Sequence, residues 1–194
     1  IDCRPVNNIN YSTIEKHDTI CSMSCVTFTN FCDTAFGGPQ SYYWQFPNGA
    51  PATSTLAFPQ VCYNLPGKYN VFLTVSNPYP LTRNGSKATK AALDYMIVVD
   101  IPNVTIVSPG QLHSDTTIRY GQNIQLNGTG AYTYSWMPNY NISNQFNKDV
   151  TVNPFRNTQY ILTGKNSSMC YSSDTLNVIV IEDCGEMYVP NAFT

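Results

Sequence analysis

The sequence predicts an all-β protein made of two β-sandwiches in tandem, and three observations support this. Runs of alternating apolar and polar residues recur along the chain, and Gly- and Pro-containing turn signals separate them. No stretch of twelve residues shows a capped helical period of 3.6 residues. The length of 194 residues allows two small domains. We therefore expect very little helix and two separate cores.

The strand pattern is clearest in the segment 70–76. Val71, Leu73 and Val75 stand at every second position, so they share one face of a half-buried strand. Further strands are expected at 25–31, 92–99, 104–107, 123–126, 149–152, 160–163 and 175–181.

A tryptophan and a later tyrosine occur in both halves of the chain at nearly the same spacing. Tyr69 follows Trp44 by 25 residues and Tyr160 follows Trp136 by 24, and each tyrosine stands after a turn at the start of a strand. A core Trp followed by such a tyrosine corner is typical of immunoglobulin-like sandwiches. We expect all four rings to lie in the two cores.

The repeat and an apolar strand that ends near Asp100 set the expected domain boundaries. These are an N-terminal extension at 1–15, a first sandwich at 16–100, a second sandwich at 101–183, and a C-terminal strand or start of a further domain at 184–194.

Charge is scarce in this chain. Asp, Glu, Lys and Arg make up 11% of the residues, against about 25% in an average soluble protein, and the net charge is -2. Ten scattered basic residues form no stripe for a phosphate backbone or an anionic bilayer, and no apolar run is long enough to cross a membrane. We expect an extracellular protein without nucleic-acid binding or membrane insertion. The chain opens at Ile1 without a Met or a signal segment, so we expect a processed or excerpted piece.

The cysteines predict disulfides rather than a zinc site, because none stands in paired C-x-x-C motifs. Cys170 is expected to pair with Cys184, and Cys3 with Cys21. Cys62 is expected to pair with Cys25 or Cys32, and the sequence does not choose between them. The candidates are therefore Cys3, Cys21, Cys25, Cys32, Cys62, Cys170 and Cys184, with one thiol left over.

The sequence contains few residues of the kinds that catalysis needs. His17 and His113 are the only histidines and fall in different expected domains, and there is no nucleophile elbow, phosphate loop or pair of placed carboxylates. We expect no enzyme activity, no catalytic or cofactor-binding residue, no metal site and no cofactor. Exposed tyrosines are the remaining chemical resource, and Tyr42, Tyr132 and Tyr140 are the candidates for stacking on sugars or anchoring an interface.

The first half resembles the PKD family of β-sandwich domains over roughly residues 20–100. The resemblance rests on the run Trp44-Gln45-Phe46-Pro47-Asn48-Gly49, a Pro66-Gly67-Lys68-Tyr69 turn and the strand Leu73-Thr74-Val75-Ser76-Asn77. Gln45 and Asn48 stand where that family often has Asp, so no calcium or acidic site is expected here.

The second half resembles the Ig-like repeats of large secreted proteins of the Bacteroidetes, through Tyr134-Ser135-Trp136-Met137-Pro138 and Thr158-Gln159-Tyr160. The tail Tyr188-Val189-Pro190-Asn191-Ala192-Phe193-Thr194 is similar to the opening of the gliding-motility-associated C-terminal domain, which is a sorting signal for type IX secretion. This resemblance implies a protein delivered to the bacterial surface.

Four Asp-Thr pairs resemble the O-glycosylation sequon of the same phylum, which makes Thr19, Thr34, Thr116 and Thr175 candidates for glycosylation. The alternative is that Asp-Thr simply suits a turn that leads into a strand. The sequence favours neither.

Together these observations predict a non-catalytic extracellular adhesion or structural module of a bacterial cell-surface protein, in the form of a self-associating fibre subunit. Its partners would be other copies of itself, surface proteins or glycans. The tail, with Tyr188, Val189 and Phe193, would add as a strand to a sheet edge of its own domain or of a neighbouring copy. The second arrangement would extend into a filament. The alternative is a pair of accessory domains, binding substrate or carbohydrate or acting as a spacer, that follow a secreted hydrolase such as a metalloprotease.

Overall fold

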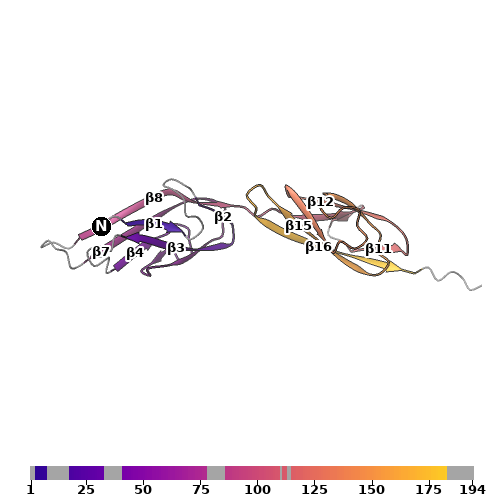
Figure 1. Cartoon of the computed structure of the whole chain (residues 1–194), viewed down its shortest axis with the longest axis horizontal. Helices are drawn as coiled ribbons and strands as arrows, with labels where there is room; N and C mark the ends of the chain where they lie inside the picture. The colour runs from indigo at the N-terminus through magenta and orange to yellow at the C-terminus, as the bar shows by residue number, and fades with distance from the viewer. Residues whose placement is uncertain are drawn as a thin grey trace, which may run out of the picture. The chain divides into compact units, whose positions relative to one another are not determined.

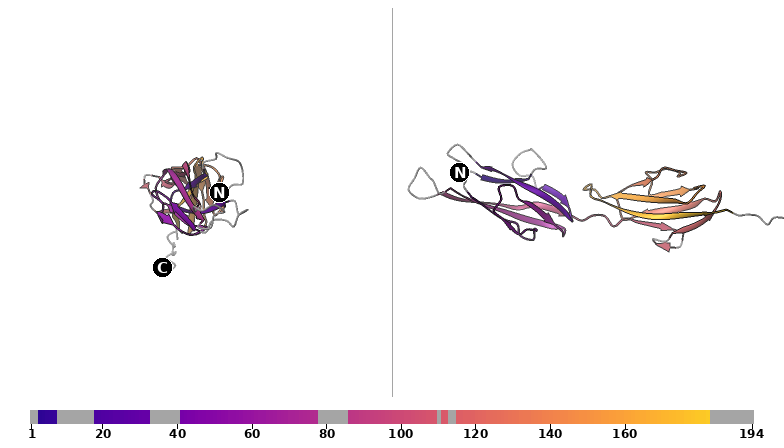
Figure 2. Two further views of the ribbon diagram at one scale, coloured as in Figure 1. Left: turned by 90° about the vertical axis from the view of Figure 1, so that its left-hand side faces the viewer. Right: turned by 90° about the horizontal axis from the view of Figure 1, so that it is seen from below.

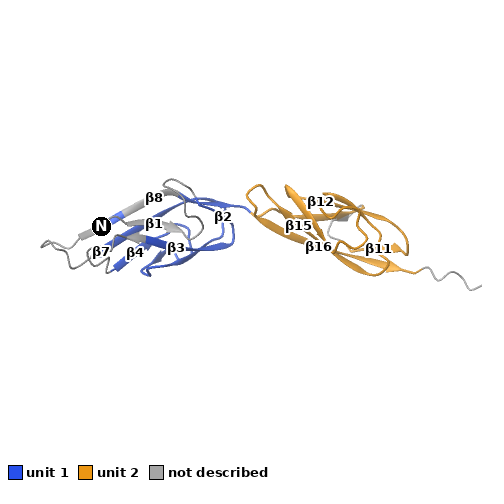
Figure 3. Ribbon diagram, in the orientation of Figure 1, with its two compact units in different colours: residues 1–100 blue, residues 101–194 orange. Residues whose placement is uncertain are grey.

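In the computed structural model the chain divides into two compact units, residues 1–100 and 101–194 (Figure 3). The structure describes residues 3–7, 18–32, 41–77, 86–109, 111–112 and 115–182. Over these residues the chain forms strands, turns and irregular segments, without a helix. The prediction of an all-β fold with two tandem Ig-like sandwiches is confirmed.

The first unit is a sandwich of a five-stranded and a three-stranded sheet (Figure 1). The larger sheet has the order β2-β8-β7-β4-β5 and the smaller one the order β1-β3-β6. The strands are β1 (Cys3–Asn7), β2 (Asp18–Cys21), β3 (Ser24–Cys32), β4 (Ser41–Gln45), β5 (Thr53–Ser54), β6 (Gln60–Tyr63), β7 (Gly67–Asn77) and β8 (Ser86–Val99).

One strand of this unit lies in the segment expected to be an extension. Residues 1–15 were expected to fall outside both sandwiches, but β1 pairs antiparallel with β3, with Cys3 opposite Cys32 and Asn7 opposite Phe28. The sequence did not predict this strand because Arg4 and Asn7 interrupt the alternation of apolar and polar residues. Its position at the edge of the sheet explains why Pro5, which has no N–H to donate, is tolerated.

The second unit is a sandwich of two four-stranded sheets, seen as two layers in Figure 2. Their orders are β10-β9-β12-β14 and β11-β16-β15-β13. The strands are β9 (Thr105–Ser108), β10 (Gln111–Leu112), β11 (Thr116–Arg119), β12 (Ile124–Thr129), β13 (Thr133–Met137), β14 (Asp149–Val152), β15 (Thr158–Lys165) and β16 (Tyr171–Ile181).

The repeat predicted from sequence also appears in the strand pairing. Within each unit an early strand lies parallel to the last one, β2 beside β8 and β11 beside β16, whereas the other described pairs are antiparallel. Each parallel strand begins at an Asp-Thr pair, with Asp18 opposite Met96 and Thr116 opposite Val178. The two units therefore share this arrangement of strands as well as the repeated Trp and Tyr.

The first core is rich in aromatic rings. Trp44 and Phe46 are stacked with centroids 5.7 Å apart, and Phe28 lies 4.7 Å from Phe46. Val71, Leu73 and Val75 are buried on the face predicted for them. The remaining buried apolar members are Ile20, Val26, Val61, Tyr63, Met96 and Val98.

The second core contains two fully buried large rings, Trp136 and Tyr160, and its other buried members are aliphatic. Both rings are fully buried, as predicted, between strands of the two sheets. Their neighbours are Val104, Ile106, Ile118, Leu126, Val150, Val152, Leu162, Leu176 and Val178.

The tyrosine corner predicted in both units is present in the first only. The Tyr69 hydroxyl donates to the carbonyl of Leu65, four residues upstream, at 2.8 Å, and the ring is half-buried against the core. The Tyr160 hydroxyl instead donates to the carbonyl of Tyr140, twenty residues upstream, at 2.7 Å. In the second unit this tyrosine therefore fixes a remote loop rather than its own turn.

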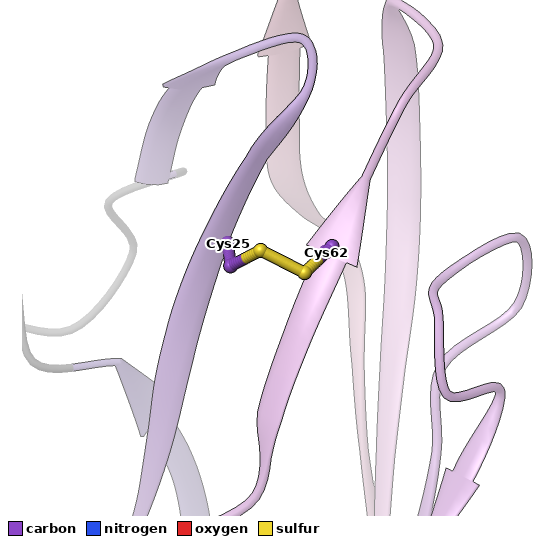
Figure 4. The surroundings of a disulfide bond; sticks show 2 residues. All are labelled: Cys25 and Cys62. Atoms are coloured by element: carbon purple, nitrogen blue, oxygen red, sulfur yellow. A yellow bond between two sulfur atoms is a disulfide. The ribbon is translucent and has the colours of Figure 1, made fainter.

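A disulfide joins Cys25 of β3 to Cys62 of β6, directly opposite each other in one sheet (Figure 4). The N–H and C=O of Cys62 both bond to Ala50 on the other side, so Cys25 and Cys62 form a non-hydrogen-bonded pair, where antiparallel backbones lie closest. Because Val26 and Val61 face the core, the disulfide lies on the outer face of the sheet. It ties two strands of one layer and leaves the interior to the aromatic rings.

Candidate interaction surfaces

Three hydrogen bonds fix a loop of the first unit to the body of the sandwich. The indole N–H of Trp44 donates to the carbonyl of Leu56 at 3.0 Å, and the side-chain amide of Asn30 donates to the carbonyl of Ala57 at 2.9 Å. The backbone N–H of Phe28 donates to the carbonyl of Pro59 at 2.8 Å. The loop is therefore held by its backbone, and its side chains need not turn inward.

Two large apolar side chains of this loop point to solvent. Leu56 is 64% exposed and Phe58 is 62% exposed. Apolar groups held out on a fixed backbone lose little conformational freedom when a partner covers them. This makes them a candidate contact point.

The second unit repeats this arrangement. The indole N–H of Trp136 donates to the carbonyl of Asn147 at 2.9 Å, and the adjacent Phe146 is 66% exposed. The N–H of Phe146 is bonded to the Asn144 side chain, two residues back, as the N–H of Leu56 is bonded to Ser54. We call residues 54–59 and 144–147 the tethered loops. In both, a core tryptophan anchors the backbone and an apolar side chain projects outward.

Each tethered loop lies in a long stretch of sequence without charge. No charged residue occurs between Asp33 and Lys68, or between Arg119 and Lys148. The loops themselves therefore offer a partner apolar groups, amides and hydroxyls, and the nearest charged residue along the chain is Lys148, directly after the second loop.

The three tyrosines expected at the surface behave differently from one another. Tyr42 packs against the first core, so its expected exposure is wrong. It lies two positions from buried Trp44 on the same strand and shares its inward face, while Tyr43 is the exposed ring. Tyr132 is exposed, and Tyr140 is half-buried.

The aspartates of two Asp-Thr pairs bond to the last strand of their own unit. The carboxylate of Asp115 accepts hydrogen bonds from the backbone and side-chain N–H groups of Asn177, which hold its pKa below the ordinary value. Asp18 is bonded to Tyr95, but partial burial outweighs this bond and raises the pKa of its carboxyl.

A third pair connects the two sheets of the second unit. The Asp174 carboxylate of β16 accepts hydrogen bonds from the N–H of Ile106 in β9 at 2.7 Å and from the N–H of Thr175 at 2.8 Å. Each described aspartate of these pairs thus has a structural role. Glycosylation of Thr19, Thr116 and Thr175 stays a prediction, and Thr34 lies outside the described residues.

Besides the pair Cys25–Cys62, the sulfurs of Cys21 and Cys170 are also in disulfides. The structure thus has Cys25, not Cys32, as the partner of Cys62. The side chains of Cys3, Cys32 and Cys184 lie outside the described residues, as do the tail residues Tyr188, Val189 and Phe193 and both histidines.

The second unit also carries a buried phenol with a shifted pKa. Burial, with the nearby Tyr140 phenol as a smaller cause, raises the pKa of Tyr160 to about 12. Its hydroxyl therefore remains a hydrogen-bond donor well above neutral pH.

Two features are absent from the described part of the chain. It contains no group of three His, Cys, Asp or Glu side chains that could hold a metal ion. Among the same residues there is also no helix with the length and hydropathy to cross a membrane.

Comparison with known proteins supports the fold. Residues 19–89 match the model of the PKD domain family. No curated protein matches the chain.

Two solved structures illustrate what the chain is similar to. The fibronectin(III)-like modules of Clostridium thermocellum CbhA share 6% identity over 92% of this chain and 95% of theirs, with a TM-score of 0.41. A Ca2+-stabilized, ice-binding adhesin of an Antarctic bacterium shares 14% identity over 86% of this chain and 47% of its own, with a TM-score of 0.43. The chain is an all-β protein of two tandem Ig-like β-sandwiches, and the first of them is similar to the PKD domain family.

Proposed function

We propose that this chain is a non-catalytic extracellular module for adhesion or structural support at a bacterial surface, and that it binds further copies of itself through the tethered loops. The observation that carries the proposal is the recurrence of one arrangement, since Leu56 and Phe146 project from loops that Trp44 and Trp136 anchor in the same way.

The physical case rests on rigidity and charge. Exposed Leu and Phe side chains on a fixed backbone favour association because burying them releases water at little entropic cost. A net charge of -2 on 194 residues produces weak repulsion between copies, and the stretches that contain the loops carry no charge at all.

The finer parts of the proposal come from the sequence. They are an origin in the Bacteroidetes, delivery by type IX secretion in a gliding-motility context, a glycoprotein with sugars on the Asp-Thr threonines, and a filament. In the filament, the tail that contains Tyr188, Val189 and Phe193 adds as a strand to a sheet edge of a neighbouring copy that the tethered loops have already bound.

Aggregation of beads coated with the protein tests self-binding. Wild-type beads should cluster, and beads coated with the L56S/F58S/F146S variant should stay dispersed. A matched control is L65S, because Leu65 is similarly exposed, at 70%, but lies outside the tethered loops. Dispersed wild-type beads, or clustering that survives the triple substitution, would contradict the proposal and favour accessory domains of a secreted hydrolase.

A further inference from the structure

A second group of exposed rings in the second unit is formed by residues outside its tethered loop. Tyr120, just after β11, and Phe155, between β14 and β15, have ring centroids 5.4 Å apart and planes tilted by 34°. Tyr120 is 59% exposed and Phe155 is 51% exposed. Two loops far apart in sequence therefore present one continuous aromatic surface.

An arginine directly follows Phe155 in the sequence and lies over a third ring, that of Tyr140. The guanidinium carbon of Arg156, the residue after Phe155, lies 5.3 Å from the centroid of the Tyr140 ring, and the Tyr140 hydroxyl accepts from the N–H of Phe155 at 3.4 Å. Arg156 is exposed and has no ion pair with any other residue in the described ranges. We call Tyr120, Tyr140, Phe155 and Arg156 the aromatic cluster.

The backbone around the aromatic cluster is fixed by hydrogen bonds. Asn141 and Asn153 are joined twice at 2.9 Å, by the Asn153 N–H to the Asn141 carbonyl and by the Asn141 side-chain amide to the Asn153 carbonyl. The buried Tyr160 hydroxyl holds the carbonyl of Tyr140, and the N–H of Tyr120 is bonded to the carbonyl of Ile181. The rings are thus positioned before any ligand arrives, which lowers the entropic cost of binding.

The chemistry of the cluster selects a class of ligand. Aromatic faces stack on the C–H face of a sugar ring, and an unpaired guanidinium binds a carboxylate in a planar, two-bonded geometry. A nucleic acid also offers rings and anions, but this acidic chain with ten scattered basic residues cannot follow a phosphate backbone. Arg156 directly follows Phe155, and Arg119, which precedes Tyr120, already has an interaction partner, so the cluster fits a single carboxylated sugar unit instead.

We propose that the aromatic cluster is a binding site for a carboxylated pyranose, such as a uronic acid unit of an acidic polysaccharide. The sugar ring lies on Tyr120 and Phe155, and the carboxylate pairs with Arg156. The site is separate from the tethered loops and does not depend on self-association.

Isothermal titration of the full chain with oligogalacturonates, against uncharged malto-oligosaccharides of equal length, tests this site. The acidic oligomer should bind more tightly, and added salt should weaken it. Arg156→Gln should weaken its binding roughly tenfold and remove the preference for the acidic sugar, as expected for loss of a charged hydrogen-bonded pair. Phe155→Ala should weaken binding of both oligomers.

The control is Tyr132→Ala, which removes an exposed tyrosine of the same unit outside the cluster. This variant should bind the oligomers as wild type does. All variants should keep the wild-type thermal midpoint. They should also still cluster in the bead assay, and this result distinguishes the sugar site from the proposed self-association. The absence of oligogalacturonate binding, or equal binding by wild type and Arg156→Gln, would overturn the proposal. Binding of acidic peptides but not of the sugar would also overturn it.

Discussion

The indole nitrogen of Trp136 lies 2.9 Å from the carbonyl oxygen of Asn147, and this hydrogen bond joins a fully buried ring of the second core to an exposed loop. The first unit has the same connection between Trp44 and Leu56. A core tryptophan thus does two things in each unit, because its ring fills the interior while its N–H sets the position of an apolar side chain at the surface.

Replacing Trp136 by Phe should therefore loosen the tethered loop as well as the core. We expect a loss of about 2–3 kcal/mol in the free energy of unfolding from the smaller ring and the missing donor. Hydrogen exchange followed by mass spectrometry should show faster exchange at residues 144–147. Unchanged protection in the loop, with the stability lowered, would mean that the indole bond does not position it.

Two buried tyrosine hydroxyls should respond oppositely to replacement by Phe. The Tyr63 hydroxyl has no hydrogen-bond partner within the described residues, so Tyr63→Phe should stabilise the first unit by about 1 kcal/mol. Tyr160→Phe should destabilise the second unit by about 1–2 kcal/mol, because the carbonyl of Tyr140 loses its donor. Denaturant unfolding measures both, and effects of equal sign would contradict these assignments.

The Tyr160 contribution should also depend on pH. Its folded-state pKa of about 12 exceeds the ordinary value near 10, so its stabilisation is complete below about pH 10 and is lost as the pH rises toward 12. The difference in thermal midpoint between wild type and Tyr160→Phe should shrink over that interval. A constant difference up to pH 12 would rule out this linkage.

Asp174 should be needed for the second unit whether or not Thr175 carries a sugar. Asp174→Ala leaves the N–H of buried Ile106 without its acceptor and should cost about 2–3 kcal/mol. Thr175→Ala removes the candidate glycosylation site, keeps the Asp174 bonds, and should cost less than about 0.5 kcal/mol. Thermal unfolding of the two variants, both made without glycosylation, distinguishes the roles, and equal losses would contradict the assignment.

Asp115 should make the second unit sensitive to acid. Its folded-state pKa lies below the ordinary value, so its stabilisation is present above about pH 4 and is lost as the pH falls through the folded-state pKa. The thermal midpoint of Asp115→Ala should lie below that of wild type at pH 7, and the two should converge toward pH 2. Parallel curves over that range would show that the ionised carboxylate is not the stabilising form.

Local pattern was enough to predict much of the fold. The alternation of Val71, Leu73 and Val75 predicted their buried face, and the spacing of Trp44 and Tyr69 predicted the repeat, because period and turn chemistry are local properties. Every second side chain of a strand lies on the same face. Applied to Tyr42 and the core residue Trp44, this alternation predicts that Tyr42 is buried.

The surfaces could not be predicted in this way. Leu56 and Phe58 alternate like a buried strand, yet they face solvent because Trp44 and Asn30, remote in sequence, hold the loop by its carbonyls. The pairing of Tyr120 with Phe155 likewise depends on two loops that only the folded sandwich brings together. Contacts between residues so far apart in the sequence produce no local pattern from which they could be predicted.

Sedimentation velocity over a series of protein concentrations tests the central claim most directly, namely that the tethered loops bind copies of this chain to each other. Wild type should sediment faster as its concentration rises, while the L56S/F58S/F146S variant should remain a monomer near 21.6 kDa at every concentration. A wild-type protein that stays monomeric throughout, or a triple variant that associates as wild type does, would contradict the claim.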